Sequence, residues 1–482
     1  MKRIKVILLL MLIAGLNKAA PASEYSPPGL YDVEYITLEN GLDVVLKKRT
    51  YVHNVVLSLV VGVGHRHFEC HKRETAHFLE HILFKGTSKH TEEELERLIE
   101  DNGGEWNAYT SSTETEYTIS IYDRNLPVAM DTLYEAITDT VITPEKIEST
   151  RKITHRENGG KHSWLVRWLY KHGISKSAGK KAGELLLPGT GVFCPGLITP
   201  DGITEKDVKE AYKNYYVPGN MTLVVVGNFD RQKLLRQIKR TFGRLSPTTS
   251  NGSKVSTPPY PNGVQEVTGI LSPLLGSDGG VYIYYRTDGS NSPDLYPLWV
   301  LMVYLDRVLF EKIRFANDLS YSPEADLSGE RDYGIFMVGA DAELDKMETV
   351  RALLEEEVEK LRQEPVKEED IEVAKRRILL AIVQGYESNV EMADYYVNSL
   401  HELKTDGKLI NRESALVKVT SKDIQQVVNK YLDSGRRVIS LSTPTLTYTQ
   451  FYTGLGILIT LALGVGPYIY WRRRRRGAVK EK

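Results

Sequence analysis

Cysteine is almost absent from this chain of 482 residues, which contains only Cys70 and Cys194. Two cysteines cannot form the disulfide framework that holds small secreted domains together, so a hydrophobic core must stabilise the fold. One bridge between them is compatible with the sequence, but two buried free thiols are the simpler expectation.

An excess of charge of either sign is also missing. The chain has 62 Lys and Arg against 63 Asp and Glu, a net charge of -1. It therefore lacks the basic surplus that neutralises phosphates, and we expect no nucleic-acid partner. Hydrophobic residues make up 41% and charged residues 26%, a balance that excludes a disordered chain and a multi-span membrane protein. The length favours two to four domains.

Long hydrophobic runs are scarce, and the first is at the N-terminus. Lys2, Arg3 and Lys5 precede an uncharged run over residues 6–16, and small residues follow at 20–22. This layout predicts a signal peptide over residues 1–22. The run is too short to cross a bilayer, which takes about 20 apolar residues.

The second run is near the C-terminus, where residues 451–471 carry no charge. Their length predicts a transmembrane helix. Arg472 to Arg476 follow directly, so the positive-inside rule places the tail, residues 472–482, in the cytoplasm. We therefore expect a membrane-anchored protein whose body is exported, into the periplasm if the source is bacterial.

Between these ends, helical and strand patterns alternate along the chain, which predicts an α+β fold. The turn pair Asn40-Gly41 indicates a hairpin. The expected elements are the hairpin at 35–46, strands at 55–63 and 116–122, and helices at 92–100 and 128–140.

An internal repeat predicts two homologous α/β-sandwich domains. Thr204 and Thr420 each precede a helical pattern that ends at a tyrosine before a short apolar strand. A Pro/Ser/Gly-rich stretch separates the two copies. We place the first domain at 28–245, the linker at 246–263 and the second domain at 264–445.

The pentapeptide His77-Phe-Leu-Glu80-His81 suggests catalytic chemistry. On a helix, His77 and His81 project from one face and can share a metal ion, while Glu80 lies beside them and can take a proton from a bound water. The alternative is two surface histidines and an acid on a solvated helix face. The context of the motif decides between the two.

That context resembles the zinc peptidase family of insulysin, pitrilysin and the mitochondrial processing peptidases, whose motif is inverted. The resemblance covers most of the region between the two terminal segments. Its pieces are His77–His81, Phe84-Lys-Gly-Thr87, Gly103-Gly-Glu-Trp-Asn-Ala-Tyr-Thr110, Thr115-Glu-Tyr117 and the segment from Tyr216 to Gly227.

The resemblance implies one zinc ion per chain, held by His77, His81 and a glutamate about 76 residues further on, which is Glu157. Glu148 is the next candidate for this third ligand. The family often has a second acid seven residues before the ligand, where this chain has Thr150. The first domain, 28–245, would then be the catalytic domain, and the second would bind no metal.

The resemblance also implies how substrate is held. The backbone around Asn107, Ala108 and Tyr109 would pair with an extended peptide. Arg314 and Tyr321 match a pair that binds and polarises the scissile peptide group. Taken alone, these two would be interpreted as an exposed helix end and a strand residue.

We therefore expect a zinc-dependent endopeptidase that hydrolyses short or unfolded peptides, with Glu80 as base and a homodimer as its assembly. The alternative is an inactive protein of the same fold that binds peptides or assembles with partners without cutting. A metal-carrying membrane protein would need further ligands on a flexible tract, which the sequence does not show. Four further histidines, His65, His67, His71 and His90, match no standard ligand spacing, and we expect most to be solvated.

Overall fold

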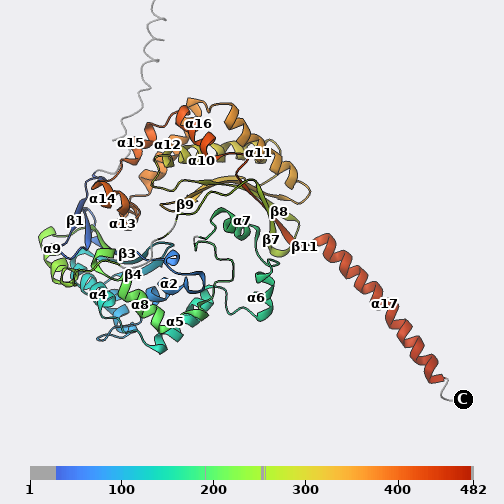
Figure 1. Ribbon diagram of the computed structural model, residues 1–482, viewed down its shortest axis with the longest axis horizontal. Coiled ribbons are helices and arrows are strands. Elements are labelled where there is room, and N and C mark those ends of the chain that lie inside the picture. The colour runs from blue at the N-terminus through green and yellow to red at the C-terminus, as the bar shows by residue number, and fades with distance from the viewer. Residues whose placement is uncertain (1–28, 190, 251–254, 256, 479–482) are drawn as a thin grey trace, which may run out of the picture. The chain divides into compact units, whose positions relative to one another are not determined.

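The computed structural model describes residues 29–189, 191–250, 255 and 257–478 (Figure 1). The predicted signal peptide, residues 1–22, lies outside these residues. The chain divides into two compact units, and each collects segments that are distant in sequence. Unit 1 comprises Met1–Lys161, Ile198–Ser256 and Lys367–Ser421, and unit 2 comprises His162–Leu197, Thr257–Val366 and Lys422–Lys482. The domain bounds drawn from the sequence stay a prediction.

Unit 1 is built on a six-stranded sheet of order β1-β2-β6-β3-β5-β4. Only the β2·β6 pair is parallel. The predicted hairpin is confirmed, because β1 and β2 pair antiparallel around a turn in which Gly41 has φ 90°. The strands are β1 (Glu34–Thr37), β2 (Asp43–Lys48), β3 (Asn54–Val61), β4 (Glu105–Thr110), β5 (Thr115–Tyr122) and β6 (Met221–Gly227).

Helices cover both faces of this sheet, so its central strands are buried on both sides. Leu57 and Leu59 of β3 lie in the core shared with α2, whereas Val56 and Val60 lie in a second core with α13. The helices of unit 1 are α2 (Thr75–Phe84), α3 (Glu92–Glu100), α4 (Leu126–Thr138), α5 (Pro144–Glu157), α8 (Glu205–Tyr215), α9 (Arg231–Arg240), α12 (Glu368–Gln384), α13 (Asn389–Asn398), α14 (Leu400–Asp406) and α15 (Arg412–Val417).

Unit 2 contains a five-stranded sheet of order β7-β11-β8-β10-β9. Its strands are β7 (Gln265–Gly276), β8 (Asp278–Thr287), β9 (Glu324–Gly329), β10 (Gly334–Glu343) and β11 (Val438–Thr447). Its helices are α6 (Trp164–Lys171), α7 (Ala178–Leu186), α10 (Leu295–Leu309), α11 (Met347–Gln363), α16 (Ser421–Tyr431) and α17 (Tyr448–Ala478), with a π-helical turn η8 at Phe310–Phe315.

The two sheets share one topology. Without β1, the order β2-β6-β3-β5-β4 corresponds strand for strand to β7-β11-β8-β10-β9. In each sheet the first pair is parallel and the other three pairs are antiparallel. The helices that the repeat predicted are α8, which Thr204 caps, and α16, and the strands after them are β6 and β11. The mixed α/β, two-domain part of the predicted fold is thus present.

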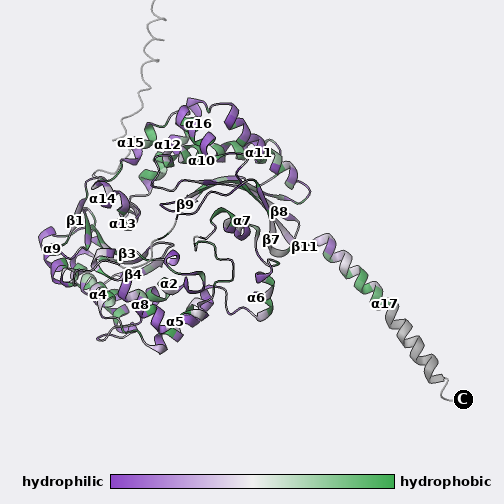
Figure 2. Cartoon of the chain, in the orientation of Figure 1, coloured by the Kyte–Doolittle hydropathy of each residue, from purple (hydrophilic) through white to green (hydrophobic). Residues whose placement is uncertain are grey.

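The predicted transmembrane helix at 451–471 is wrong. Among the residues that the structure describes, no helix has both the length and the apolar character needed to cross a bilayer. α17 begins with the polar run Tyr448–Gln450 and continues through Arg472–Arg476, and its coloured part in Figure 2 mixes hydrophilic and hydrophobic residues. The predicted membrane anchor and the cytoplasmic placement of residues 472–482 are corrected with it.

The expectation of free thiols is also wrong. Cys70 and Cys194 are both disulfide-bonded, and neither is a free thiol. The sequence could not decide this, because pairing depends on how close two thiols come after folding.

Candidate metal centre

Helix α2 presents the histidine motif on the side that its packing leaves open. Thr75, Ala76, Phe78, Leu79, Ile82 and Leu83 are buried in the core of unit 1. His77, Glu80 and His81 lie on the remaining side and are partly exposed. The predicted helix, with His77 and His81 on one face, is therefore confirmed.

Glu157 reaches the two histidines from the end of α5, which packs against α2. The Nε2 atoms of His77 and His81 lie 3.1 Å apart. Glu157 Oε2 lies 3.2 Å from His81 Nε2 and 3.4 Å from His77 Nε2. Of the described residues, these three form the one group of potential ligands whose atoms all lie within 4.8 Å of one another.

These distances fit zinc. Two ligand atoms on a tetrahedral zinc ion, each about 2.0–2.1 Å from the metal, lie roughly 3.3 Å apart. Two imidazoles and one carboxylate are also a donor set typical of catalytic zinc, with the fourth position left to water. The alternative candidate, Glu148, instead lies 3.2 Å from Arg151 Nε and is exposed.

The end of α5 is closed by backbone hydrogen bonds directly after Glu157. The N–H of Asn158 donates to the Thr154 carbonyl, and the N–H of Gly160 donates to the His155 carbonyl. Gly159 and Gly160 have φ of 81° and 94°, values that glycine adopts without the strain of a side chain. Helix α5 therefore ends at Glu157, with carbonyl groups of its last turn satisfied by backbone donors.

Glu80 is not part of the ligand group, and it is held by a neighbouring strand. Thr110, the last residue of β4, donates its hydroxyl to Glu80 Oε2. The Tyr117 and Tyr216 hydroxyls lie 2.6 Å apart, and the charge of Glu80 acts on both. Burial raises the pKa of both tyrosines, so their hydroxyls stay neutral beside the carboxylate.

Burial and the surrounding charges shift the pKa of His77 in opposite directions. Burial alone would lower the pKa of this imidazole, but its hydrogen bond to Glu74 and the charges of Glu80, Glu74 and Glu157 raise the pKa above its usual value. The site therefore attracts positive charge, as a cation site must.

The strand predicted to hold substrate is at an edge of the unit 1 sheet. β4 pairs with β5 on one side only. Asn107 and Tyr109 are exposed and Ala108 is half-buried. Such an edge can take an added strand. Within it, the Ala108 N–H donates to Asn107 Oδ1 at 2.9 Å, and Thr110 connects the edge to Glu80.

Arg314 and Tyr321 belong to unit 2, and the structure brings them together. Arg314 lies in η8, its Nη1 donates to the Tyr321 carbonyl at 2.9 Å, and its guanidinium lies 3.9 Å from the centre of the Tyr321 ring. Tyr321 is 73% exposed. The structure thus forms the pair, while its role toward substrate stays a prediction.

The other motif histidines are less solvated than predicted. His65 is largely buried, and its Nδ1 lies 3.1 Å from the Arg73 carbonyl. His67 packs edge-on against Tyr215. His90 Nδ1 lies 2.7 Å from Glu135 Oε1, and only His71 has a mostly exposed side chain, at 62%. Sequence spacing missed these contacts because their partners are on other segments.

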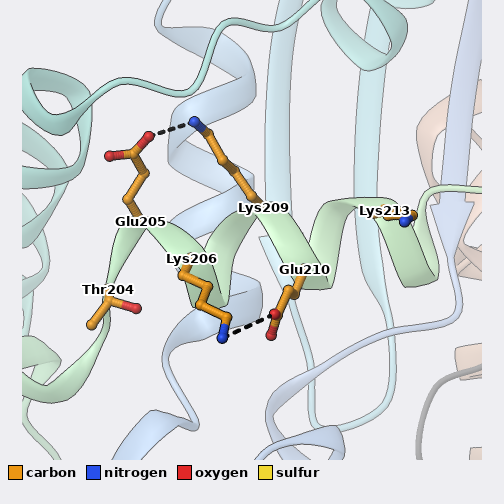
Figure 3. Close-up of a pocket in the computed structure, with 6 residues that line it drawn as sticks. All are labelled: Thr204, Glu205, Lys206, Lys209, Glu210 and Lys213. Carbon is orange, nitrogen blue, oxygen red and sulfur yellow. Dashed lines mark hydrogen bonds and ion pairs between the residues drawn. The ribbon is translucent and has the colours of Figure 1, made fainter.

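A shallow hollow on α8 is a second candidate site, and its chemistry is that of a solvated helix face (Figure 3). Its charged side chains pair with one another along the helix, Glu205 with Lys209 and Lys206 with Glu210. Such i, i+4 pairs stabilise a helix surface. Both carboxylates of the hollow are therefore paired with lysines of the same helix.

Comparison with known families agrees with the metal centre. The profile described as "Insulinase (Peptidase family M16)" matches residues 43–164, which contain His77, Glu80, His81 and Glu157. The profile described as "Peptidase M16 inactive domain" matches residues 202–378. The chain belongs to peptidase family M16, the insulinase family.

Two of the similar proteins match most of the chain. An "Uncharacterized zinc protease" of Rickettsia bellii is 26% identical over 82% of this chain and 94% of its own length. The probable mitochondrial-processing peptidase subunit beta of Arabidopsis thaliana is 25% identical over 82% of this chain and 75% of its own. Relatives named zinc proteases indicate that zinc is the metal of the family.

Solved structures show the same M16 fold. A protease from Helicobacter pylori superposes with a TM-score of 0.71 at 21% identity, covering 86% of this chain and 100% of that one. The periplasmic protease PqqL from Escherichia coli gives a TM-score of 0.70 at 19% identity, with 86% of this chain and 47% of that chain covered.

Proposed function

We propose that this M16 chain is a zinc-dependent endopeptidase that cleaves short or unfolded peptides. The observation that carries the proposal is the convergence of His77, His81 and Glu157 at distances suited to zinc, with Glu80 beside them and outside the ligand group. A structural zinc site would need no such acid.

The residues then divide the work. His77, His81 and Glu157 hold the zinc ion, which when bound supplies Lewis acidity toward a water and a carbonyl. Glu80 takes the proton from the attacking water and passes it to the leaving amine. The hydrogen bond from Thr110 restrains Glu80 in the orientation for this transfer.

Substrate binding is assigned to the β4 edge. The backbone of Asn107, Ala108 and Tyr109 pairs with an extended peptide, which favours short or unfolded chains because a folded domain has few free strands to offer. Arg314 and Tyr321 assist at the scissile carbonyl. We further propose that the chain acts as a homodimer, which the mass of the purified protein in solution tests.

The decisive experiment measures zinc content and cleavage of a quenched, unstructured peptide by the full chain and by Glu80→Gln. We expect both proteins to hold one zinc ion and the variant to lose about 10²–10⁴-fold in kcat, the usual contribution of a general base. Zinc binding without cleavage of any peptide in a broad library would instead favour the inactive, peptide-binding alternative.

A matched pair of variants tests the third ligand. Glu157→Gln and Glu148→Gln make the same change on the same helix, and only Glu157 lies within reach of the histidines. We expect zinc to be lost from Glu157→Gln and retained by Glu148→Gln. The reverse result would move the ligand to Glu148.

A further inference from the structure

Glu74 occupies the position before the first residue of α2, three residues ahead of His77, and its side chain is almost fully buried. An acid at this position of a helix ordinarily accepts hydrogen bonds from the backbone N–H groups of the first turn. Glu74 makes no such bond. Its carboxylate is used elsewhere.

That carboxylate contacts His77 at the ring nitrogen that lies away from the ligand group. Glu74 Oε2 lies 2.9 Å from His77 Nδ1, while the other ring nitrogen, Nε2, lies 3.1 Å from His81 Nε2 and 3.4 Å from Glu157 Oε2. The two nitrogens of one ring therefore have separate partners, one facing the core and one facing the ligand group.

The remaining oxygen of Glu74 lies near a histidine and an arginine. Its Oε1 lies 3.9 Å from His65 Nδ1 and 3.9 Å from Arg73 Nε. An ionised carboxylate can only accept hydrogen bonds, so Nδ1 of His77 must carry the hydrogen in this pair. In the neutral ring, Nε2 then holds the lone pair, and this is the form that binds a metal.

We propose that Glu74 is a positioning residue that holds His77 in the Nδ1–H form, with Nε2 directed at the zinc site. This inference rests on the proposed zinc-peptidase function. A carboxylate behind a ligating histidine fixes the orientation of the ring and raises its basicity, and loss of such a partner costs about 10–100-fold in metal affinity.

The test compares zinc dissociation constants, measured by competition with a fluorescent chelator, in full chains carrying Glu74→Ala, Glu74→Gln or no change. We expect Glu74→Ala to weaken zinc binding by about 10–100-fold. Glu74→Gln should lose less, because its amide oxygen can still accept from Nδ1. A Glu74→Ala chain that binds zinc within about twofold of wild type overturns the proposal.

Glu135→Gln is the matched control. Glu135 is also a mostly buried glutamate that pairs with a histidine Nδ1, that of His90 at 2.7 Å, and neither residue is in the ligand group. Its substitution should leave zinc affinity unchanged. A comparable loss in Glu135→Gln would show that breaking any such pair disturbs the fold, and would overturn a specific role for Glu74.

A second measurement keeps the proposal testable if Glu74→Ala does not fold or if the wild type takes up no zinc. Nitrogen-15 NMR of histidine-labelled, metal-free protein reports which ring nitrogen of His77 carries the hydrogen, with the signals assigned from a His77→Gln chain. Nδ1–H in the wild type supports the proposal. Nε2–H in the wild type overturns it, whatever the outcome of the peptidase assay.

Discussion

The two sheets place a helix at the same point in their topology, yet only one of these helices carries metal-site residues. α2 follows β3, and α10 follows the corresponding strand β8. Both bury an apolar side, including Leu79 in α2 and Leu305 in α10. α10 contains no histidine, and its one acid is Asp306. Packing therefore maintains the helix position, while a few residues on the open side determine the chemistry.

The largest effect should come from removing a ligand on that open side. We expect His81→Ala to lose zinc and to lower cleavage by about a thousandfold or more, because a catalytic zinc site needs its three protein ligands. His401→Ala, an exposed histidine of α14 in the same unit, should change neither. Metal analysis and peptide cleavage measure both. Activity that survives without zinc would show that the metal-site residues of α2 do not determine the chemistry.

Packing should matter equally in both helices. Leu79→Ala and Leu305→Ala each remove a fully buried side chain, and each should lower the free energy of unfolding by about 2–5 kcal/mol. Urea unfolding followed by circular dichroism measures this. We expect Leu305→Ala to keep its zinc content. A negligible effect in α10 would show that the two helices do not share a packing role.

A smaller effect should follow from removing the hydrogen bond that holds Glu80. Thr110→Val removes the hydroxyl that donates to Glu80. A hydrogen bond to a charged group contributes about 1.5–3 kcal/mol, so we expect kcat to fall roughly 10–100-fold with zinc content unchanged. Thr115→Val removes a similar hydroxyl, bonded to the Val63 carbonyl, and should affect stability rather than kcat per zinc. Equal kcat losses in both variants would remove the special role of Thr110.

The smallest effect concerns unit 2, where a carboxylate serves stability instead of metal binding. Burial would raise the pKa of Asp288, but hydrogen bonds from Tyr260, Lys430 and Tyr431 lower it to about 2. Because the pKa is lower in the folded state, the ionised Asp288 stabilises the fold at pH values above its usual pKa of 3.8. This contribution disappears as the pH falls from about 4 to 2.

The matching variant is Asp288→Asn, compared with wild type by urea unfolding at several pH values. We expect the wild type to be the more stable at pH 5, and the difference to shrink toward pH 2. Because Asp288 is partly exposed, the effect should be modest. A difference that stays constant with pH would contradict this assignment.

Local patterns predicted the elements of unit 1 well. The helix at Glu92–Glu100 has the predicted bounds, and the predicted strand and helix at 116–122 and 128–140 are present within two residues at each end. These elements are set by residues near in sequence: periodicity places the apolar side, and Thr91 caps its helix through Glu94. The family resemblance added Glu157, which no local pattern could connect to a histidine 76 residues away.

What the sequence left open depends on contacts between distant segments. The transmembrane prediction rested on the uncharged length of residues 451–471, but no helix among the described residues has both the length and the apolar character to cross a bilayer. The prediction that these histidines are solvated failed because their partners are on other helices. His67 packs against Tyr215, and His90 pairs with Glu135. Glu74 could have been found, since an acid three residues before a ligand histidine is visible in the sequence, but only the structure shows its rotamer.

The position of α13 on the unit 1 sheet has a consequence for how the protein is made. Its Tyr396 hydroxyl donates to the Leu30 carbonyl, across 366 residues of chain, and in Figure 1 the orange helix lies over strands drawn in blue and green. A nascent chain on the ribosome therefore displays one valine-rich sheet face to water until α13 has been synthesised. Long-range closure of this kind slows folding and exposes apolar surface meanwhile. The metal centre is encoded early in synthesis, but the unit that supports it is finished late.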